Sequence, residues 1–121
     1  MKKKIKIRDL TSSMQKKSFN QVFKIYEVLK KLTKKSPVVF DVGACQGQTI
    51  IEMVKNFKNC KIHSCEANKN LLPELNYIKR KYKKKANIRI NTVAVGNKKK
   101  NLTFYLHPDP SQSSFLKINF N

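Results

Sequence analysis

Apolar residues recur along the chain with two kinds of spacing, one typical of helices and one typical of buried strands. Helical spacing runs from Ser18 to Leu32 and again from Thr49 to Phe57. Between these two segments, Val38–Val42 is a short and almost continuous apolar run, which is typical of a strand buried on both faces. The first half of the chain therefore reads as helix, strand and helix.

The same alternation continues in the second half. Residues 61–65 form a short run that predicts a second strand, and Pro73 fits the first turn of a further helix. Residues 88–95 predict a third strand. A turn then leads to residues 102–106, which predict a hairpin-like fourth strand, and the Pro- and Ser-rich segment 107–114 predicts a loop.

Strands separated by helices indicate an α/β fold built from right-handed crossovers, with a parallel sheet and helices on both faces. Residues 1–17 are polar and basic, and we expect them to form an N-terminal arm. Residues 18–121 are then expected to form a single domain. Its ligand site should lie beyond the carboxyl ends of the strands, as in other open parallel sheets.

Two of the three glycines, Gly43 and Gly47, lie where the first strand passes into its helix, which predicts a tight turn close to a ligand. Glu66 ends the second strand, where an acid can accept hydrogen bonds from the two hydroxyl groups of a ribose. The turn lacks the middle glycine of a dinucleotide-binding fingerprint. Asp41 precedes it instead, and a carboxylate there suits a cationic ligand such as S-adenosylmethionine. The alternative is that Asp41 only holds the turn by accepting backbone N–H bonds.

Three segments carry a family resemblance: Asp-Val-Gly-Ala-Cys-Gln-Gly-Gln at 41–48, Glu-Ala-Asn at 66–68, and residues 91–97 before the predicted hairpin. They resemble the FkbM family of S-adenosylmethionine-dependent methyltransferases, over roughly residues 38–116. The resemblance implies a partial Rossmann-like sheet of the class I methyltransferase type. It also implies transfer of a methyl group to a hydroxyl of a small-molecule acceptor, such as a sugar or a metabolite.

The resemblance further implies which residues contact the cofactor. These are Asp41, Gly43, Ala44, Cys45, Gln46 and Gly47 in the turn, Glu66 and Ala67 after the second strand, and Thr92, Val93 and Ala94 after the third. Asp41 and the glycines would lie around the methionine end, Glu66 on the ribose and the last group near the adenine. The chain departs from the family pattern at Cys45, where Asn is usual, and at Ala67, where Pro is usual. Ser113 and Ser114 match a serine-rich stretch of the family loosely.

Members of the family continue into an acidic motif on a further parallel strand, and residues 115–121 contain no such motif. We therefore expect this chain to be the cofactor-binding half of the fold. The strand that would flank Val38–Val42 is then missing, and an open strand edge attracts other strands. The edge is expected to pair with a second copy or with another chain, unless residues 5–7 or 115–120 fold over it.

The net positive charge of the chain is also compatible with a second function. Lys and Arg number 27 against seven acidic residues, for a net charge of +20, which favours phosphate-bearing partners. A basic module that binds nucleic acid or an anionic surface is the alternative to a methyltransferase. The lysine runs have few aromatic residues between them, which is unlike a surface that binds single-stranded nucleic acid. An inactive fragment of a split reading frame is a third interpretation.

Other features narrow the picture. No apolar run approaches the roughly 18 residues of a membrane span, and the basic N-terminus lacks the apolar stretch of a secretory signal, so a cytoplasmic location is expected. Three cysteines are expected to be reduced thiols, and Cys60–Cys65 lacks the ligands of a metal site.

The catalytic base is not identified. His107 and Asp109 are candidates, although a Pro-flanked loop pair is also an ordinary surface feature.

Overall fold

The computed structural model describes residues 24–33 and 35–117 of the chain. The chain divides into two compact units, residues 1–32 and residues 33–121. In the first unit, residues 24–32 are helical, as predicted for the later part of the segment 18–32. The earlier part of that segment, the basic arm and the predicted boundary between residues 17 and 18 lie outside the described residues.

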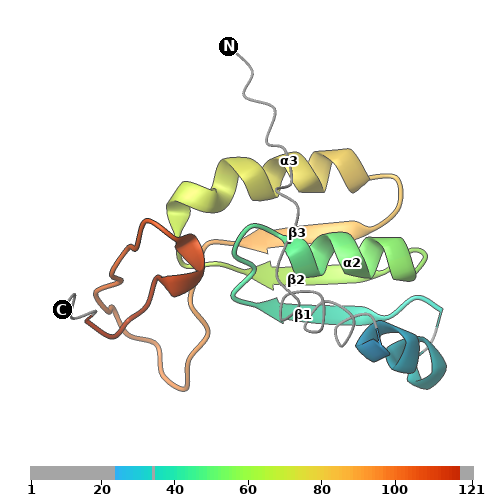
Figure 1. Ribbon diagram of the computed structural model, residues 1–121, viewed down its shortest axis with the longest axis horizontal. Coiled ribbons are helices and arrows are strands. Elements are labelled where there is room, and N and C mark those ends of the chain that lie inside the picture. Colours follow the sequence, from blue (N-terminus) through green and yellow to red (C-terminus); the bar gives the residue numbers. More distant parts are fainter. Residues whose placement is uncertain (1–23, 34, 118–121) are drawn as a thin grey trace, which may run out of the picture. The chain divides into compact units, whose positions relative to one another are not determined.

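The second unit is built on a three-stranded parallel sheet with the strand order β1-β2-β3 (Figure 1). Its elements are β1 (Val38–Val42), α2 (Gln48–Asn56), β2 (Lys61–Cys65), α3 (Leu72–Tyr82) and β3 (Asn87–Asn91). Val39 lies beside Ile62, and Ile62 lies beside Ile88, so the strands are in simple register. The prediction of a parallel α/β sheet is therefore confirmed, with the third strand ending at Asn91 rather than at Val95.

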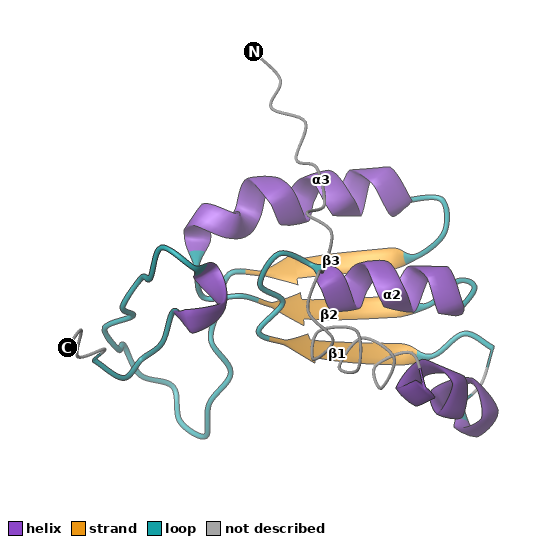
Figure 2. Ribbon diagram, in the orientation of Figure 1, coloured by secondary structure: helices purple, strands orange, loops and turns teal. Residues whose placement is uncertain are grey.

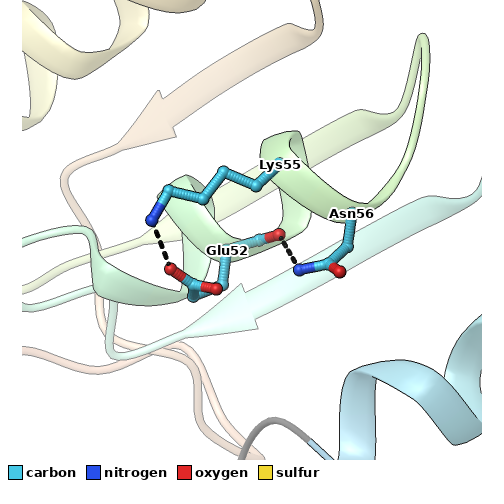
Figure 3. Close-up of polar contacts among 3 residues, drawn as sticks. All are labelled: Glu52, Lys55 and Asn56. Carbon is cyan, nitrogen blue, oxygen red and sulfur yellow. Dashed lines mark hydrogen bonds and ion pairs between the residues drawn. The ribbon is translucent and has the colours of Figure 1, made fainter.

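Both helices form because one stripe of each is apolar and can pack on the sheet. In α2 the buried side chains are Ile50, Met53 and Val54. The outer face of α2 carries an ion pair of 2.7 Å between Lys55 and Glu52, and Asn56 donates a hydrogen bond to the carbonyl of Glu52 (Figure 3). These contacts are local and stabilise the helix by only about 0.5 kcal/mol per pair.

Helix α3 follows a short 3₁₀ turn, η1 (Lys69–Leu71), and has proline in its first turn, where the missing N–H costs nothing. Leu75 and Ile78 are buried on its inner face, as predicted, whereas Tyr82 is half-buried. Neither α2, with nine residues, nor α3, with 11, has the length needed to cross a bilayer, and the same holds for every helix in the described segments.

The two helices cover the same face of the sheet. Ile62, Ser64 and Ile88 point to that face and are buried. Phe40 points to the other face and is 75% exposed, with its ring stacked on that of His63 at 5.2 Å. Within residues 35–117 the expected cover of both faces is therefore met on one face only. The prediction that Val38–Val42 is buried on both faces is wrong, because only Val39 and Asp41 of that strand turn inward.

Residues 92–117 lie at the carboxyl ends of the strands and consist of loops with one short helix, η2 (Pro110–Gln112) (Figure 2). The predicted hairpin strand over residues 102–106 is wrong, since only an isolated antiparallel bridge joins Tyr105 to Ser114. Leu102 and Leu106 are both exposed, so no buried face stabilises a strand there. The rings of Phe104 and Phe115 pack together instead, at 4.8 Å.

Candidate functional site

The turn between β1 and α2 is fixed by hydrogen bonds to the end of the neighbouring strand. The backbone N–H groups of Gly43 and Ala44 both donate to the carbonyl of Cys65, at 2.9 and 3.1 Å. Gly43, Cys45 and Gly47 have φ angles of 83°, 46° and 81°, in the left-handed region. That conformation is accessible to glycine and costs other residues roughly 1 kcal/mol or more. The turn is therefore specified by its two glycines, and Cys45 adopts an unfavourable backbone conformation between them.

Glu66 connects the ends of all three strands. One carboxylate oxygen accepts a hydrogen bond of 2.8 Å from the backbone N–H of Cys45, and the other accepts one of 2.7 Å from that of Asn68. Its own N–H donates to the carbonyl of Asn91, at the end of β3. The residue is 7% exposed. A carboxylate has about four acceptor positions, so two remain for a ligand that lies against it.

The two glycines of the turn have different surroundings. A Cβ atom added to Gly43 would meet nothing within 4 Å, so the space beside this residue is open. A Cβ atom on Gly47 would lie 2.5 Å from Cδ1 of Ile78 and 3.2 Å from Cδ2 of Leu75. Gly47 therefore allows α2 to pack closely against α3. Only the first glycine faces space in which a ligand could lie.

Asp41 lies below the turn, on the face of the sheet that the helices cover. It is buried, and the hydroxyl of Ser64 donates a hydrogen bond of 3.2 Å to its carboxylate. Burial raises the pKa of Asp41 above its ordinary value, the charge of Glu66 raises it further, and the bond from Ser64 opposes both. Asp41 thus accepts its hydrogen bond from a side chain of β2. The alternative interpretation of the sequence was that it accepts backbone N–H bonds from the glycine turn.

A cavity of about 320 Å³ opens at the carboxyl ends of the strands. Six of the predicted site residues line it: Gly43, Cys45, Glu66, Ala67, Val93 and Ala94. They come from the segments after β1, β2 and β3, which lie far apart in sequence. The size is at the lower end of the range of pockets that bind small molecules and cofactors.

The other predicted residues lie around this cavity without lining it. Asp41, Ala44 and Gly47 are buried, and Gln46 is exposed beside the side chain of Gln48. Thr92 lines a second hollow of about 680 Å³. The two hollows share six lining residues: Ala67, Val93, Ala94, Val95, Phe104 and Phe115. Of the two carboxylates proposed to share one ligand, only Glu66 lines the cavity.

Sequence reasoning missed part of the cavity wall. Val42 and Cys65, at the ends of their strands, and residues from the loop after β3 complete the lining: Val95, Phe104, Pro110, Ser111, Ser113, Ser114 and Phe115. The serine pair of the family resemblance was the one signal for this wall. No periodic pattern marks the two phenylalanines, because their ring contact forms between loop segments 11 residues apart.

The cysteine in the turn has the properties of an unreactive thiol. Burial raises the pKa of Cys45, a hydrogen bond with the backbone of Gln46 opposes this, and the charges of Glu66, Asp109 and Glu74 raise the pKa further, so the thiol stays protonated at neutral pH. None of the three cysteines forms a disulfide. Within residues 24–33 and 35–117, no group of three or more His, Cys, Asp or Glu side chains is placed to hold a metal ion.

The two candidates for the catalytic base, His107 and Asp109, form hydrogen bonds within their own loop. Asp109 is the N-cap of η2, and its carboxylate accepts hydrogen bonds from the N–H and the hydroxyl of Ser111 and from Gln112. These bonds lower the pKa of Asp109, which makes it a weaker base. The backbone N–H of Asp109 in turn donates to Nδ1 of His107 at 3.0 Å. The pair therefore stabilises the loop.

Comparison with known protein families adds an independent finding. The family model of the methyltransferase FkbM domain matches residues 41–121, which is more than half of the chain. The match begins at Asp41, at the end of β1, and includes every residue that lines the cavity. No curated protein and no solved structure matched the chain.

Proposed function

Because the chain belongs to the FkbM methyltransferase family, we propose that the cavity beside Glu66 holds S-adenosylmethionine for methyl transfer to a hydroxyl of a sugar or metabolite. The family implies this cofactor, which supplies a methyl group activated by a positively charged sulfur. The observation that carries the proposal is the position of Glu66. Within residues 24–33 and 35–117 it is the one acid that lines the cavity, and its carboxylate is held in place by two backbone N–H groups.

The chemistry of the lining fits an adenosine group. The free acceptor positions of Glu66 can receive hydrogen bonds from two ribose hydroxyls, because two vicinal hydroxyls match the two oxygens of one carboxylate. The open space beside Gly43 leaves room for the chain to lie close to the backbone. Ala67, Val93 and Ala94 are small or apolar side chains that can pack on the faces of a flat ring.

Asp41 contributes indirectly in this proposal. Its carboxylate lies below the turn and adds negative charge near the methionine end, where the sulfonium and the ammonium of the cofactor would lie. A buried carboxylate costs less when a cation approaches, since the attraction offsets part of the desolvation. The direct or water-mediated contact suggested by the sequence stays a prediction, as do contacts from Ala44, Cys45, Gln46, Gly47 and Thr92.

The acceptor is proposed to approach through the second hollow, which shares a wall with the first. Methyl transfer to a hydroxyl needs close alignment of oxygen, carbon and sulfur, and a group that takes the hydroxyl proton. Asp109 is a poor candidate for that group, because its carboxylate already accepts three hydrogen bonds within its own loop. The base is therefore left unassigned.

Isothermal titration calorimetry with S-adenosylhomocysteine, the demethylated product, tests the cofactor proposal. The whole chain should bind one equivalent, and Glu66→Gln should weaken binding by at least roughly tenfold, the effect of losing one charged hydrogen bond. Ala94→Phe should abolish binding, because the larger side chain fills the cavity although no hydrogen-bonding group is removed. Glu74→Gln removes an acid from the first turn of α3, outside the cavity lining, and should bind as the wild type does.

The same titration separates the alternatives. A basic module for nucleic acid or an anionic surface would bind an RNA oligonucleotide with a steep salt dependence and would be indifferent to Glu66→Gln. An inactive fragment would bind neither ligand. Association with a second copy or another chain through β1 is a separate proposal, supported by the open edge of that strand in the sheet.

A further inference from the structure

The opposite end of the sheet carries a concentration of positive charge. A hollow of about 490 Å³ opens at the amino ends of β2 and β3, and five lysines line it. These are Lys61 from β2, Lys79 from the last turn of α3, and Lys83, Lys84 and Lys85 from the turn that follows. Strands of five residues are about 16 Å long, so this hollow is well separated from the cavity at the carboxyl ends.

Backbone hydrogen bonds fix the two turns that carry the hollow. The N–H of Asn59, in the turn before β2, donates to the carbonyl of Lys85 at 3.1 Å. The N–H of Asn87 donates to the carbonyl of Cys60 at 2.9 Å, so the chain before β3 is bonded to the chain before β2. Ala86 and Ile88 are buried at the base of the hollow. The lysine stems therefore start from a hydrogen-bonded frame, and Asn59 and Asn87 line the hollow with them.

These positive charges are not balanced nearby. Among the described residues, no acid lines the hollow and none of the five lysines forms an ion pair. The C-terminus of α3 supplies a partial negative charge of only about half a unit, which accounts for one or two cations but not five. The acids of residues 35–117 lie elsewhere in the fold: Asp41 is in β1, Glu66 follows β2, Glu74 is in the first turn of α3, Asp109 caps η2, and Glu52 pairs with Lys55.

We propose that this hollow is a second binding site, for a compact anion with three or more linked phosphate groups. Five ammonium groups around one concave surface repel one another, and several phosphate oxygens held together would relieve that repulsion at several points at once. The amide N–H groups of Asn59 and Asn87 add neutral donors for the same oxygens. The tail of a nucleoside triphosphate and free inorganic polyphosphate share this chemistry.

The shape and lining favour a compact anion over a nucleic acid strand. In the part of the chain that the structure describes, no aromatic side chain lines the hollow, whereas surfaces that hold single strands use aromatic rings for base stacking. The lysines come from three different segments and surround one hollow, instead of following one continuous groove that would track a nucleic acid backbone. A cluster of linked phosphates in the hollow would lie against side chains from all three segments.

The test is calorimetric titration of the whole chain with inorganic tripolyphosphate near physiological salt. Binding should be weakened at least roughly tenfold by the triple variant Lys83→Gln, Lys84→Gln, Lys85→Gln, since three exposed charge pairs of modest strength are lost. The matched control is Lys98→Gln, Lys99→Gln, Lys100→Gln, which removes the same charge from a loop at the other end of the sheet. This control should stay within about twofold of the wild type, as should Glu66→Gln.

Titrations with other compounds identify which phosphate compound binds, and circular dichroism checks that the variants are folded. Orthophosphate should bind much more weakly than tripolyphosphate. ATP should bind the wild type more tightly than the triple variant of residues 83–85, whereas adenosine should bind these two proteins equally. Circular dichroism verifies that each variant is folded, and if the triple variant is not, Lys61→Gln and Lys79→Gln in separate elements should each weaken binding measurably. The proposal is overturned if tripolyphosphate does not bind, if both triple variants weaken it equally, or if orthophosphate binds as well. Tighter binding of an RNA oligonucleotide, lost equally in both triples, would also overturn it.

Discussion

The carboxylate of Glu66, which follows β2, accepts a hydrogen bond of 2.8 Å from the backbone N–H of Cys45, in the turn that follows β1. Two segments 21 residues apart in sequence are thereby joined at one edge of the sheet. The bond holds Cys45 in its left-handed conformation and points the carboxylate into the cavity wall. One acidic residue thus has a structural role and a position suited to ligand binding.

The structural role of Glu66 predicts a loss of stability that is separable from ligand binding. Glu66→Gln places an amide N–H₂ group against one of two backbone donors, so one hydrogen bond is lost and a donor is left unsatisfied. We expect the free energy of unfolding to fall by about 1–2 kcal/mol in urea denaturation. Glu74→Gln, at the start of α3, is the control and should change it by less than about 0.5 kcal/mol. Equal effects would contradict the role assigned to Glu66.

The two glycines of the turn should respond differently to alanine. Both substitutions place a side chain at a positive φ, which costs roughly 1 kcal/mol. Gly47→Ala also forces a Cβ atom to within 2.5 Å of Ile78, and overpacking of this kind costs about 1–3 kcal/mol more. Gly43→Ala should therefore be the milder change in stability. Thermal melts of both variants check the order, and a Gly43→Ala variant that is less stable than Gly47→Ala would contradict it.

The buried Asp41 predicts a pH dependence of stability. Because burial raises its pKa in the folded state above the ordinary 3.8, the folded protein holds this proton more tightly than the unfolded chain does. Stability from this group is complete below the unfolded pKa and is lost as the pH rises through the folded pKa. Asp41→Asn keeps an acceptor for Ser64 and removes the charge. It should be more stable than the wild type at pH 8, and the advantage should shrink towards pH 4.

Urea denaturation of the two proteins at several pH values measures that difference directly. Titrating groups that do not interact with Asp41 contribute equally to both proteins, so their contributions cancel in the comparison. A difference in unfolding free energy that does not change between pH 4 and pH 8 would show that Asp41 has no raised pKa in the fold.

In the part of the chain that the structure describes, β1 is an edge strand with one exposed face, which predicts self-association. Phe40 is 75% exposed, and Val38 and Val42 flank it on the same face. We expect the apparent mass in size-exclusion chromatography with light scattering to rise with protein concentration, despite the repulsion from a net charge of +20. Phe40→Lys should suppress this rise. Tyr77→Lys adds the same charge at an exposed site on α3 and should not. A monomer at every concentration would contradict the prediction.

The sequence predicted the elements that have a strong periodic pattern. The bounds of β1 and β2 agree with the apolar runs, and the buried stripe of α3 contains Leu75 and Ile78 as expected. These elements are defined by their own residues, because burial of an apolar face against the sheet is what stabilises them. Glu66 was also predictable, since its distance from the glycine turn places it at the end of the next strand.

What the sequence did not predict depends on contacts between distant segments. The strand over residues 102–106 does not form, because no neighbouring strand pairs with it and its leucines stay exposed. The sequence placed Gly47 in a turn close to a ligand. Its steric role is revealed only by the packing of α2 on α3. The cavity wall at Phe104 and Phe115 depends on how the loop after β3 folds back, which no local pattern specifies.

The position of the cofactor beside Glu66 can be tested directly by NMR. S-adenosylhomocysteine is added to the uniformly ¹⁵N-labelled chain, and the backbone amide signals are recorded during the titration. We expect saturable shifts at Gly43, Cys45, Glu66, Val93 and Ala94, which lie at the carboxyl ends of the strands. The amides of Asn59, Lys85 and Asn87, at the other end of the sheet, should not move. Shifts confined to that other end, or no saturable shift at all, would contradict the claim that the cofactor lies beside Glu66.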